Sequence, residues 1–486
     1  MISLTFIKNK SIITSILLCS LFIFNLRNNL FPTNFQQDDI AELEPIFFDR
    51  LICAFEWGDQ HPLFSAIIWI SSQIFEWPEY FISSLIVLFA IFSIVLFFNF
   101  LENLFNFNLA LLGSVIFITS PIFNTYTIGL KQYNFEIFTT ILCLWFLQNY
   151  KDYESNSKYY FYFLISCFLL FLLSFAAAIP IAISILFLIK LNKRLTYIPL
   201  FLFVASLPLQ DNLFNKLSRV SNGGYWDEFF ISTSSFNNFF ESFYFLNQLF
   251  LKSIFPVFSH PLLTFIIFLS VLSVVFKKNE LIIYSFVGLV SLYLLSIFQF
   301  YPLGGGRTDL LFIPFAIVLF LNFIDIFINK IFPTKYLNFV SFLAIGYLIF
   351  ILATTNVFYK NEDVASALTN IQNFYNDEEV AIIVTEEQSH SLLYYSAKYY
   401  DLGRLPSENC SMKLSIDNLY VQKDNESMAE IKEINNNSEI YLLGIELPNT
   451  LGQIRIITQQ LTQEGFVLIE EQTFPGYIKL IYFNRR

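Results

Sequence analysis

Acidic side chains crowd into a stretch that directly follows the first long apolar run of the chain. Within Gln36–Leu63 the pair Asp38 and Asp39 comes first, and the dipeptide His61-Pro62 comes near the end, where it can form a turn before a helix. Ionised carboxylates beside a bilayer are costly unless they are solvated or paired. A carboxylate here can act as a general base toward a lipid-borne substrate or as a metal ligand. A solvated loop is the simpler alternative.

A second set of polar residues lies in the stretch GLKQYNFE, at the start of another apolar run. Tyr133 and Glu136 are three residues apart, so a helix places both on one face. Lys131 precedes them, on the side of the membrane that carries few basic residues in the topology predicted below. Such a lysine can bind lipid headgroups, and it can also hold a phosphate.

The third set is the sequence YPLGGGR at Tyr301–Arg307. Three consecutive glycines leave backbone N–H groups open to a ligand and allow its close approach. Arg307 follows at the predicted end of a membrane span, where a guanidinium can pair with a phosphate through two hydrogen bonds. The alternative is a flexible turn with an arginine that reaches the headgroups. Together, an acid and cationic phosphate binders suit transfer of a sugar from an isoprenoid phosphate, because the anionic leaving group needs stabilisation.

The composition is that of a polytopic α-helical membrane protein. Hydrophobic residues make up 55% of the chain and charged residues only 14%, against about 25% charged residues in soluble domains. The net charge of −11 comes mostly from the ends of the chain and gives no argument for nucleic acid as a partner.

Apolar runs and basic turns predict about 11 transmembrane helices. Ser11–Leu30 is too long for a cleaved signal segment and is expected to remain as the first span. Lys8 and Lys10 precede it, so the positive-inside rule places the N-terminus in the cytoplasm and the C-terminus outside. Pro62–Phe75 is too short to cross and is predicted as an interfacial helix. The other spans are predicted at Tyr80–Phe100, Phe107–Phe123, Phe135–Tyr150, Tyr159–Ile189 (two passes with a bend at Ser174–Pro180), Tyr197–Leu209, Leu262–Phe276, Leu281–Phe298, Leu310–Ile328 and Tyr336–Thr354.

These patterns divide the chain into two predicted domains. Residues 1–357 form the transmembrane domain, with a first external loop at 32–79 and a second at 210–260 that carries further interfacial helices. Residues 358–486 form an external α/β domain. Its predicted strands are EEVAIIV, SEIYLLG, FVLIEEQTF and YIKLIYF, and its predicted helix is TLGQIRIITQQLTQEG.

The five cysteines show no metal-binding spacing. Cys19, Cys143 and Cys167 lie in apolar runs and are expected to be ordinary core residues. Cys53 and Cys410 fall on the same predicted side of the membrane, so a disulfide between them is one possibility.

In its motifs the chain resembles the GT-C-fold glycosyltransferases, the superfamily of protein O-mannosyltransferases and aminoarabinose transferases, in their bacterial form. QQDDIAE resembles the acidic pair of their first external loop, and DQHPLFSAII resembles a following His-Pro-Pro-Leu motif with Leu63 in place of the second proline. LKQYNFE resembles a Lys-x-Tyr-x-x-Asp motif with Glu136 in place of the aspartate, and YPLGGGR resembles a Tyr-Pro-x-Gly-Gly-Arg loop. The resemblance covers Ser11–Phe327 in order and spacing.

The resemblance implies an inverting transferase that moves a hexosyl or pentosyl group from a polyprenyl-phosphate donor at the external face of a bacterial inner membrane. Asp38 would deprotonate the acceptor, which can be a glycan, a lipid or a protein, and Asp39 and His61 would orient acceptor or donor. Lys131 and Arg307 would hold the lipid phosphate. The remaining two positions, Tyr133 and Glu136, would shape the pocket. A divalent metal is possible but not indicated.

Two other functions stay open at this point. A flippase or transporter of lipid-linked saccharides would need polar groups near mid-membrane and often paired repeats, and the predicted spans show neither. A lipid-linked polysaccharide polymerase would be favoured by arginine-rich external loops, whereas the predicted external loops are mainly acidic.

Overall fold

The structure, a computed structural model, divides the chain into two compact units. The helical unit comprises Met1–Leu30, Gly58–Phe64 and Ile82–Phe358, and the sheet unit comprises Phe31–Trp57, Ser65–Phe81 and Tyr359–Arg486. The residues described are 9–27, 43–47, 50–57, 61–75, 77–150, 157–191, 227–255, 269–275, 279–304, 306–331, 346, 364–371, 380–385, 394–395, 398, 419–422, 439–445, 451–474 and 478–485. Outside them lie Asp38, Asp39, Cys410, the predicted span at 197–209 and much of the spans predicted at 262–276 and 336–354.

Three helical segments among the described residues are long and apolar enough to cross a membrane. They are α5 (Glu79–Leu104), α16 (Glu280–Ile297) and the segment Arg307–Phe327, which joins η8 (Arg307–Phe312) to α17 (Ile313–Ile331). They coincide with three of the predicted spans. Shorter apolar helices lie at Lys10–Leu26, Pro62–Ser72, Phe161–Leu173 and Phe175–Leu188. The mostly helical membrane architecture is therefore confirmed, whereas the number of about 11 transmembrane helices is not.

Two of the predicted apolar regions are each divided into two helices. The predicted span at 107–123 forms α6 (Phe107–Thr119) and α7 (Pro121–Ile128), which meet at an angle of 53° and together can make a fourth, broken span. Pro121 opens α7, and Ser120 caps it by accepting a hydrogen bond from the N–H of Phe123. The region 159–189 divides, as predicted, into α10 (Ser157–Leu173) and α11 (Ala178–Leu191), separated by the 3₁₀ turn η3 (Phe175–Ala177).

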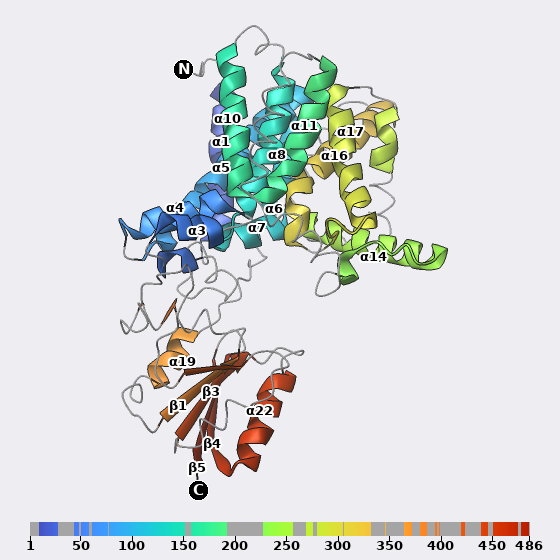
Figure 1. The fold of residues 1–486 in the computed structure, drawn as a ribbon. Helices are drawn as coiled ribbons and strands as arrows, with labels where there is room; N and C mark the ends of the chain where they lie inside the picture. The colour runs from blue at the N-terminus through green and yellow to red at the C-terminus, as the bar shows by residue number, and fades with distance from the viewer. Residues whose placement is uncertain are drawn as a thin grey trace. The chain divides into compact units, whose positions relative to one another are not determined.

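α17 packs among its neighbours through close approaches at small residues. It contacts α16, α6 and α8 (Tyr133–Gln148). A Cβ added at Gly288 would lie 2.5 Å from the ring of Phe315, and one added at Gly113 would lie 2.6 Å from Leu321. Glycine at these two positions lets the helices approach closely, as is typical of membrane helices. In Figure 1 α5, α8, α10, α11, α16 and α17 run alongside one another, and α14 (Phe236–Ile254) runs across their direction.

The remaining elements before the C-terminal region are short, apart from α1 (Asn9–Leu26). α4 (Pro62–Ser72) has 11 residues, about half of the 20 that a crossing needs, which agrees with the predicted interfacial assignment by length. The others are η2 (Glu44–Phe47), α3 (Leu51–Trp57), η6 (Asp227–Phe229) and η7 (Ser273–Val275).

The C-terminal region of the sheet unit contains the predicted α/β fold. Its five-stranded sheet has the order β2-β1-β3-β5-β4, in which β1 is parallel to β2 and β3 whereas β5 is antiparallel to β3 and β4. The strands are β1 (Val380–Thr385), β2 (Leu419–Gln422), β3 (Glu439–Ile445), β4 (Phe466–Phe474) and β5 (Ile478–Arg485), with helices α19 (Val364–Ile371) and α22 (Leu451–Gln463). All four predicted strands and the predicted helix are present; β2 and α19 escaped prediction because both are short.

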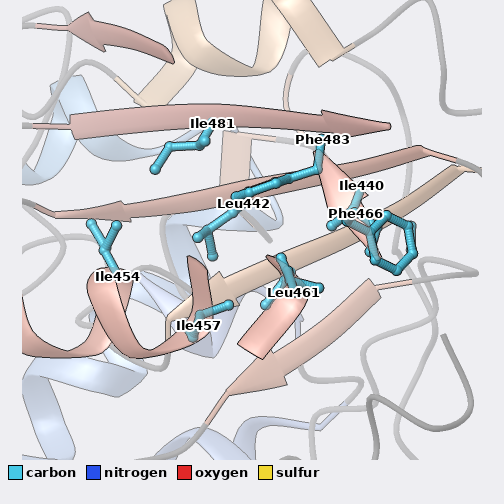
Figure 2. Close-up of a cluster of buried hydrophobic side chains, with 10 residues drawn as sticks. Ile440, Leu442, Ile454, Ile457, Leu461, Phe466, Ile481 and Phe483 are labelled. Atoms are coloured by element: carbon cyan, nitrogen blue, oxygen red, sulfur yellow. The ribbon is translucent and has the colours of Figure 1, made fainter. Parts of the chain in front are cut away.

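One face of this sheet buries the apolar side of α22 (Figure 2). Ile454, Ile457 and Leu461 recur at helical spacing along α22 and pack with Ile440, Leu442 and Ile481 of the central strands. The same helix is polar elsewhere, so its burial against the sheet follows from the 3.6-residue period of its apolar side chains.

Candidate functional site

The start of α8 holds two of the predicted site residues, Tyr133 and Glu136. Glu136 is only 3% exposed, and its Oε1 accepts a hydrogen bond of 2.5 Å from Oγ of Ser174, at the break between α10 and η3. One turn further along, Oγ1 of Thr140 donates to the carbonyl oxygen of Leu311 at 2.9 Å. These two bonds fix the first turns of α8 against α10 and η8.

The glycine loop, Tyr301–Arg307, has a conformation that depends on its glycines. Gly304 and Gly306 have φ angles of +75° and +71°. Residues that carry a Cβ rarely adopt such positive φ angles. A Cβ at Gly304 would also lie 2.9 Å from the carbonyl oxygen of Leu246 in α14. The glycines are therefore explained by the shape of the loop and its close contact with α14.

The carboxylate of Asp309 occupies the backbone donors of this loop. Its Oδ1 accepts from the N–H of Gly304 at 2.9 Å, and its Oδ2 accepts from the N–H of Gly306 at 3.2 Å. Asp309 is fully buried, and a buried charge requires such donors. The structure thus corrects the interpretation of these two N–H groups as donors to a ligand, because a side chain of the protein already uses them.

Arg307, the last residue of the glycine loop, interacts electrostatically with the start of α8. Its positive charge interacts with Glu136, and α8 packs against η8. Tyr301, at the other end of the loop, interacts electrostatically with Glu136, Tyr133 and Arg307. The structure therefore brings together Tyr133, Glu136 and Arg307, which lie far apart in the sequence.

Tyr301 remains a protonated hydroxyl in this environment. Burial raises the pKa of its phenol well above its usual range, and the nearby carboxylates of Glu136 and Asp309 raise the pKa further. A neutral Tyr301 can donate a hydrogen bond to an anion, which a phenolate cannot do.

Lys131 and His61 also lie near the start of α8. Lys131 precedes this helix in the sequence, whereas His61 is linked to it by ring contacts. Lys131 is 8% exposed, in the connection between α7 and α8, two residues before Tyr133. The ring of His61 lies 5.8 Å from that of Phe64, whose ring lies 5.7 Å from that of Phe135 in α8. Asp38 and Asp39 lie outside the described residues, so their predicted roles stay predictions.

Sequence reasoning missed the roles of Asp309, Tyr301 and Ser174. Asp309 follows Gly306 by three residues, the spacing at which an acidic side chain bonds back to the backbone N–H that precedes a helical turn. That spacing is a usable signal. For Ser174 the sequence predicts only a bend, whereas its hydrogen bond to Glu136 joins residues 38 positions apart.

The arrangement suits an anionic ligand. A guanidinium, an ammonium and neutral hydroxyls can each contribute to binding a phosphate. Within the part of the chain that the structure describes, there is no group of three or more His, Cys, Asp or Glu side chains that could hold a metal ion.

Among the cysteines, Cys53 is disulfide-bonded, whereas Cys19, Cys143 and Cys167 are free. Disulfides persist in oxidising compartments, which agrees with the predicted external position of Cys53. The predicted partner, Cys410, lies outside the described residues, so that pairing stays a prediction.

No family model matches this sequence, and no curated protein matches it either. Solved structures do match. ArnT from Cupriavidus metallidurans in the apo state superposes with a TM-score of 0.56 at 9% identity, over 97% of this chain and 97% of that one. ArnT bound to undecaprenyl phosphate gives a TM-score of 0.54 at 9% identity and the same coverage.

An oligosaccharyltransferase from Archaeoglobus fulgidus, in complex with Zn and sulfate, gives a TM-score of 0.51 at 12% identity. The match covers 89% of this chain and 67% of that one. ArnT and the archaeal enzyme are GT-C-fold glycosyltransferases. The predicted resemblance to the GT-C fold is therefore confirmed by three-dimensional structure, at identities where sequence comparison finds nothing.

Proposed function

We propose that this protein is a membrane glycosyltransferase that moves a sugar from a polyprenyl-phosphate donor to an acceptor at the external face of a bacterial inner membrane. Two observations support the proposal. The chain has the fold of two transferases, one of which has been solved with undecaprenyl phosphate. Arg307, Glu136 and Tyr133 also converge at the start of α8, and this convergence is the observation that carries it.

The proposed roles follow from the charges. Arg307 and Lys131 hold the phosphate of the donor and stabilise the negative charge that develops on it as the sugar leaves. Tyr301 donates a further hydrogen bond to that phosphate. Glu136 orients the guanidinium of Arg307, and Tyr133 lines the same pocket.

The acceptor hydroxyl loses its proton to a carboxylate in the proposed reaction. Asp38 is the proposed general base, with Asp39 and His61 orienting acceptor or donor. The acceptor oxygen attacks the anomeric carbon as the bond to the phosphate oxygen breaks, so the configuration at that carbon inverts. The polyprenyl phosphate leaves as an anion. The reaction is a substitution at the anomeric carbon, so it needs no oxidant or reductant.

The test is transfer from radiolabelled polyprenyl-phosphate sugars in membranes that contain the wild-type protein or Asp38→Asn at matched expression. We expect the wild type to transfer label and the variant to lose about a hundredfold or more, as removal of a general base predicts. Glu42→Gln is the matched control, because it removes a charge from the same acidic segment at a residue to which no role is assigned. Equal transfer by Asp38→Asn and wild type would exclude Asp38 as the base.

A negative result with every donor also has a defined meaning. If a broad donor panel gives no transfer, yet a lipid-linked sugar changes leaflets in a protein-dependent way, the transferase proposal is wrong and the flippase alternative replaces it.

A further inference from the structure

Three buried amide side chains lie at the corner between α7 and α8, within the helical unit. Asn124 is in α7, Gln132 directly precedes α8 and Asn134 is in its first turn. Their exposed fractions are 2%, 6% and 1%, in that order. The amide oxygen of each has no hydrogen-bond partner within the described structure. Buried acceptors without a partner are uncommon in folded proteins, so three of them at one corner need an explanation.

The hydrogen bonds of Asn134 and Asn124 define which end of each amide is open. Nδ2 of Asn134 donates to Oγ1 of Thr127 at 3.1 Å, and that hydroxyl donates its own hydrogen to the carbonyl oxygen of Phe123 at 2.7 Å. Because Oγ1 of Thr127 can then only accept, a reversed amide would lose the bond. Nδ2 of Asn124 donates to two backbone carbonyl oxygens, at 3.0 and 2.9 Å, which also can only accept. The open atoms are therefore oxygens.

This corner adjoins the residues proposed to hold the donor phosphate. Lys131 immediately precedes Gln132, and α7 packs against both α8 and η8, the segment that begins at Arg307. A Cβ added at Gly306 would lie 2.9 Å from Cδ1 of Ile122 in α7, so the glycine loop meets the same short helix. A donor whose phosphate is held by Arg307 and Lys131 would therefore have its sugar beside the open amide oxygens.

We propose that Asn124, Gln132 and Asn134 recognise the sugar of the donor by accepting hydrogen bonds from its hydroxyl groups. An amide oxygen offers no donor and carries no full charge, so it suits a neutral O–H group rather than a second phosphate. A sugar that lacks the matched hydroxyl would leave a buried oxygen unpaired, and a site built in this way rejects such an analogue. The inference rests on the proposed function for its choice of a lipid-linked sugar as the ligand.

The first experiment measures binding to the purified full-length protein in detergent and needs no acceptor. The probes are polyprenyl phosphate and its conjugates with glucose, mannose, galactose and xylose. One hydrogen bond to a neutral group changes affinity by about twofold to tenfold. We therefore expect at least one conjugate to bind about tenfold or more tightly than polyprenyl phosphate. Equal binding of all four conjugates and polyprenyl phosphate would overturn the proposal.

The second experiment combines single-deoxy analogues of the best-bound sugar with Asn134→Leu and Gln132→Leu. In the wild type at least one analogue should bind about fivefold or more weakly than the parent sugar. In the variant that lacks the matched oxygen, analogue and parent should bind equally well, because the two changes remove the same hydrogen bond.

Two results would contradict the assignment. A deoxy series that costs the same affinity in the wild type and in both variants would show that other groups meet the hydroxyls. A wild-type protein that binds every deoxy analogue as well as the parent sugar would refute the proposal without any variant, so the test stands even if neither variant folds.

Asn322→Leu is the matched control. Asn322 is fully buried in α17, and its Oδ1 also has no partner in the part of the chain that the structure describes. Its Nδ2 donates to Oγ of Ser273 at 2.8 Å, as that of Asn134 does to a threonine. It lies about 14 Å along the helix from the first residue of α17. Sugar affinity should stay within about twofold of wild type, and a loss equal to that of Asn134→Leu would refute a specific role of the corner.

Binding and transfer together separate this inference from the proposed function. Sugar-dependent binding that Asn134→Leu or Gln132→Leu weakens, in a protein that transfers no sugar, would keep the recognition site and remove the transferase. Transfer that depends on Asp38, with a donor kcat/KM that neither variant changes, would keep the transferase and refute the recognition site.

Discussion

The glycine loop and the start of α8 both suit a phosphate by sequence, yet the structure uses their polar groups in opposite ways. In the glycine loop the N–H groups of Gly304 and Gly306 are taken by Asp309. At the start of α8, Oε1 of Gln132 and Oδ1 of Asn134 are buried, and neither has a hydrogen-bond partner in the described structure. Two described donors of the glycine loop are used within the protein, whereas two described acceptors at the start of α8 are open.

The difference indicates that the glycine loop is a scaffold, and it leaves the proposed phosphate binding to side chains. A loop whose backbone donors are already used can still place Arg307 accurately, because Asp309 and two positive φ angles define its conformation. Open acceptors beside Lys131 and Tyr133 match the hydroxyl groups of a sugar, since buried carbonyl oxygens gain most from a new donor. This division of roles can be tested one residue at a time.

The largest effect is expected for Arg307→Ala. Transfer activity should fall about a hundredfold or more, because one lost donor to a developing negative charge costs about that much. The melting temperature in detergent should stay near the wild-type value. Arg307→Lys should recover only part of the activity, since an ammonium lacks the two-pronged geometry. Activity within twofold of wild type in Arg307→Ala would remove Arg307 from the phosphate site.

The second largest effect is expected for Asp309→Ala, which should lower both stability and activity. The buried N–H of Gly304 and the partly buried N–H of Gly306 lose their acceptor, and an unsatisfied buried N–H costs about 1–3 kcal/mol. We expect a lower melting temperature and an activity loss of about tenfold, measured on the purified protein. Thr308→Ala is a suitable control on the neighbouring residue, whose Oγ1 has no hydrogen-bond partner within the described structure. A stable and fully active Asp309→Ala protein would contradict the scaffold role of the loop.

A smaller effect is expected for Gly306→Ala. Its φ of +71° disfavours a Cβ by about 1–2 kcal/mol, and the new Cβ would lie 2.9 Å from Cδ1 of Ile122. Thermal unfolding should shift down, with activity reduced a few fold. Gly465→Ala also changes a glycine of positive φ, at +92° and with no atom within 4 Å of the new Cβ. Gly465→Ala is therefore a control for the effect of a positive φ on stability at a glycine outside the glycine loop. A Gly306→Ala variant more stable than Gly465→Ala would argue against the strained loop.

The smallest effect is expected for Glu136→Gln. A glutamine can still accept the hydrogen bond from Ser174, so the variant removes only the ionisable group that interacts with Arg307. Activity should fall a few fold, mainly through a higher donor KM. A loss of a hundredfold in kcat would instead assign Glu136 a direct part in proton transfer.

Local pattern was enough to predict most individual elements. The apolar period of α22, the runs that became α5, α16 and α17, and the break at Ser174 depend on residues close in sequence, and each is present in the structure. The bend at Ser120 was missed, although Pro121 marks it, because the apolar run continues through it. β2, with four residues, was too short to stand out.

The sequence by itself determined the membrane class, the GT-C resemblance and the residue types available for phosphate chemistry, because hydropathy and short motifs are local properties. Only the tertiary structure decided that Asp309 uses the N–H groups of Gly304 and Gly306, that Arg307 interacts electrostatically with Glu136, and that Lys398 pairs with Glu79. Apart from that of Asp309, these interactions join residues that are far apart in the sequence. Even there, the carboxylate needs a loop with two left-handed residues before it can reach both N–H groups.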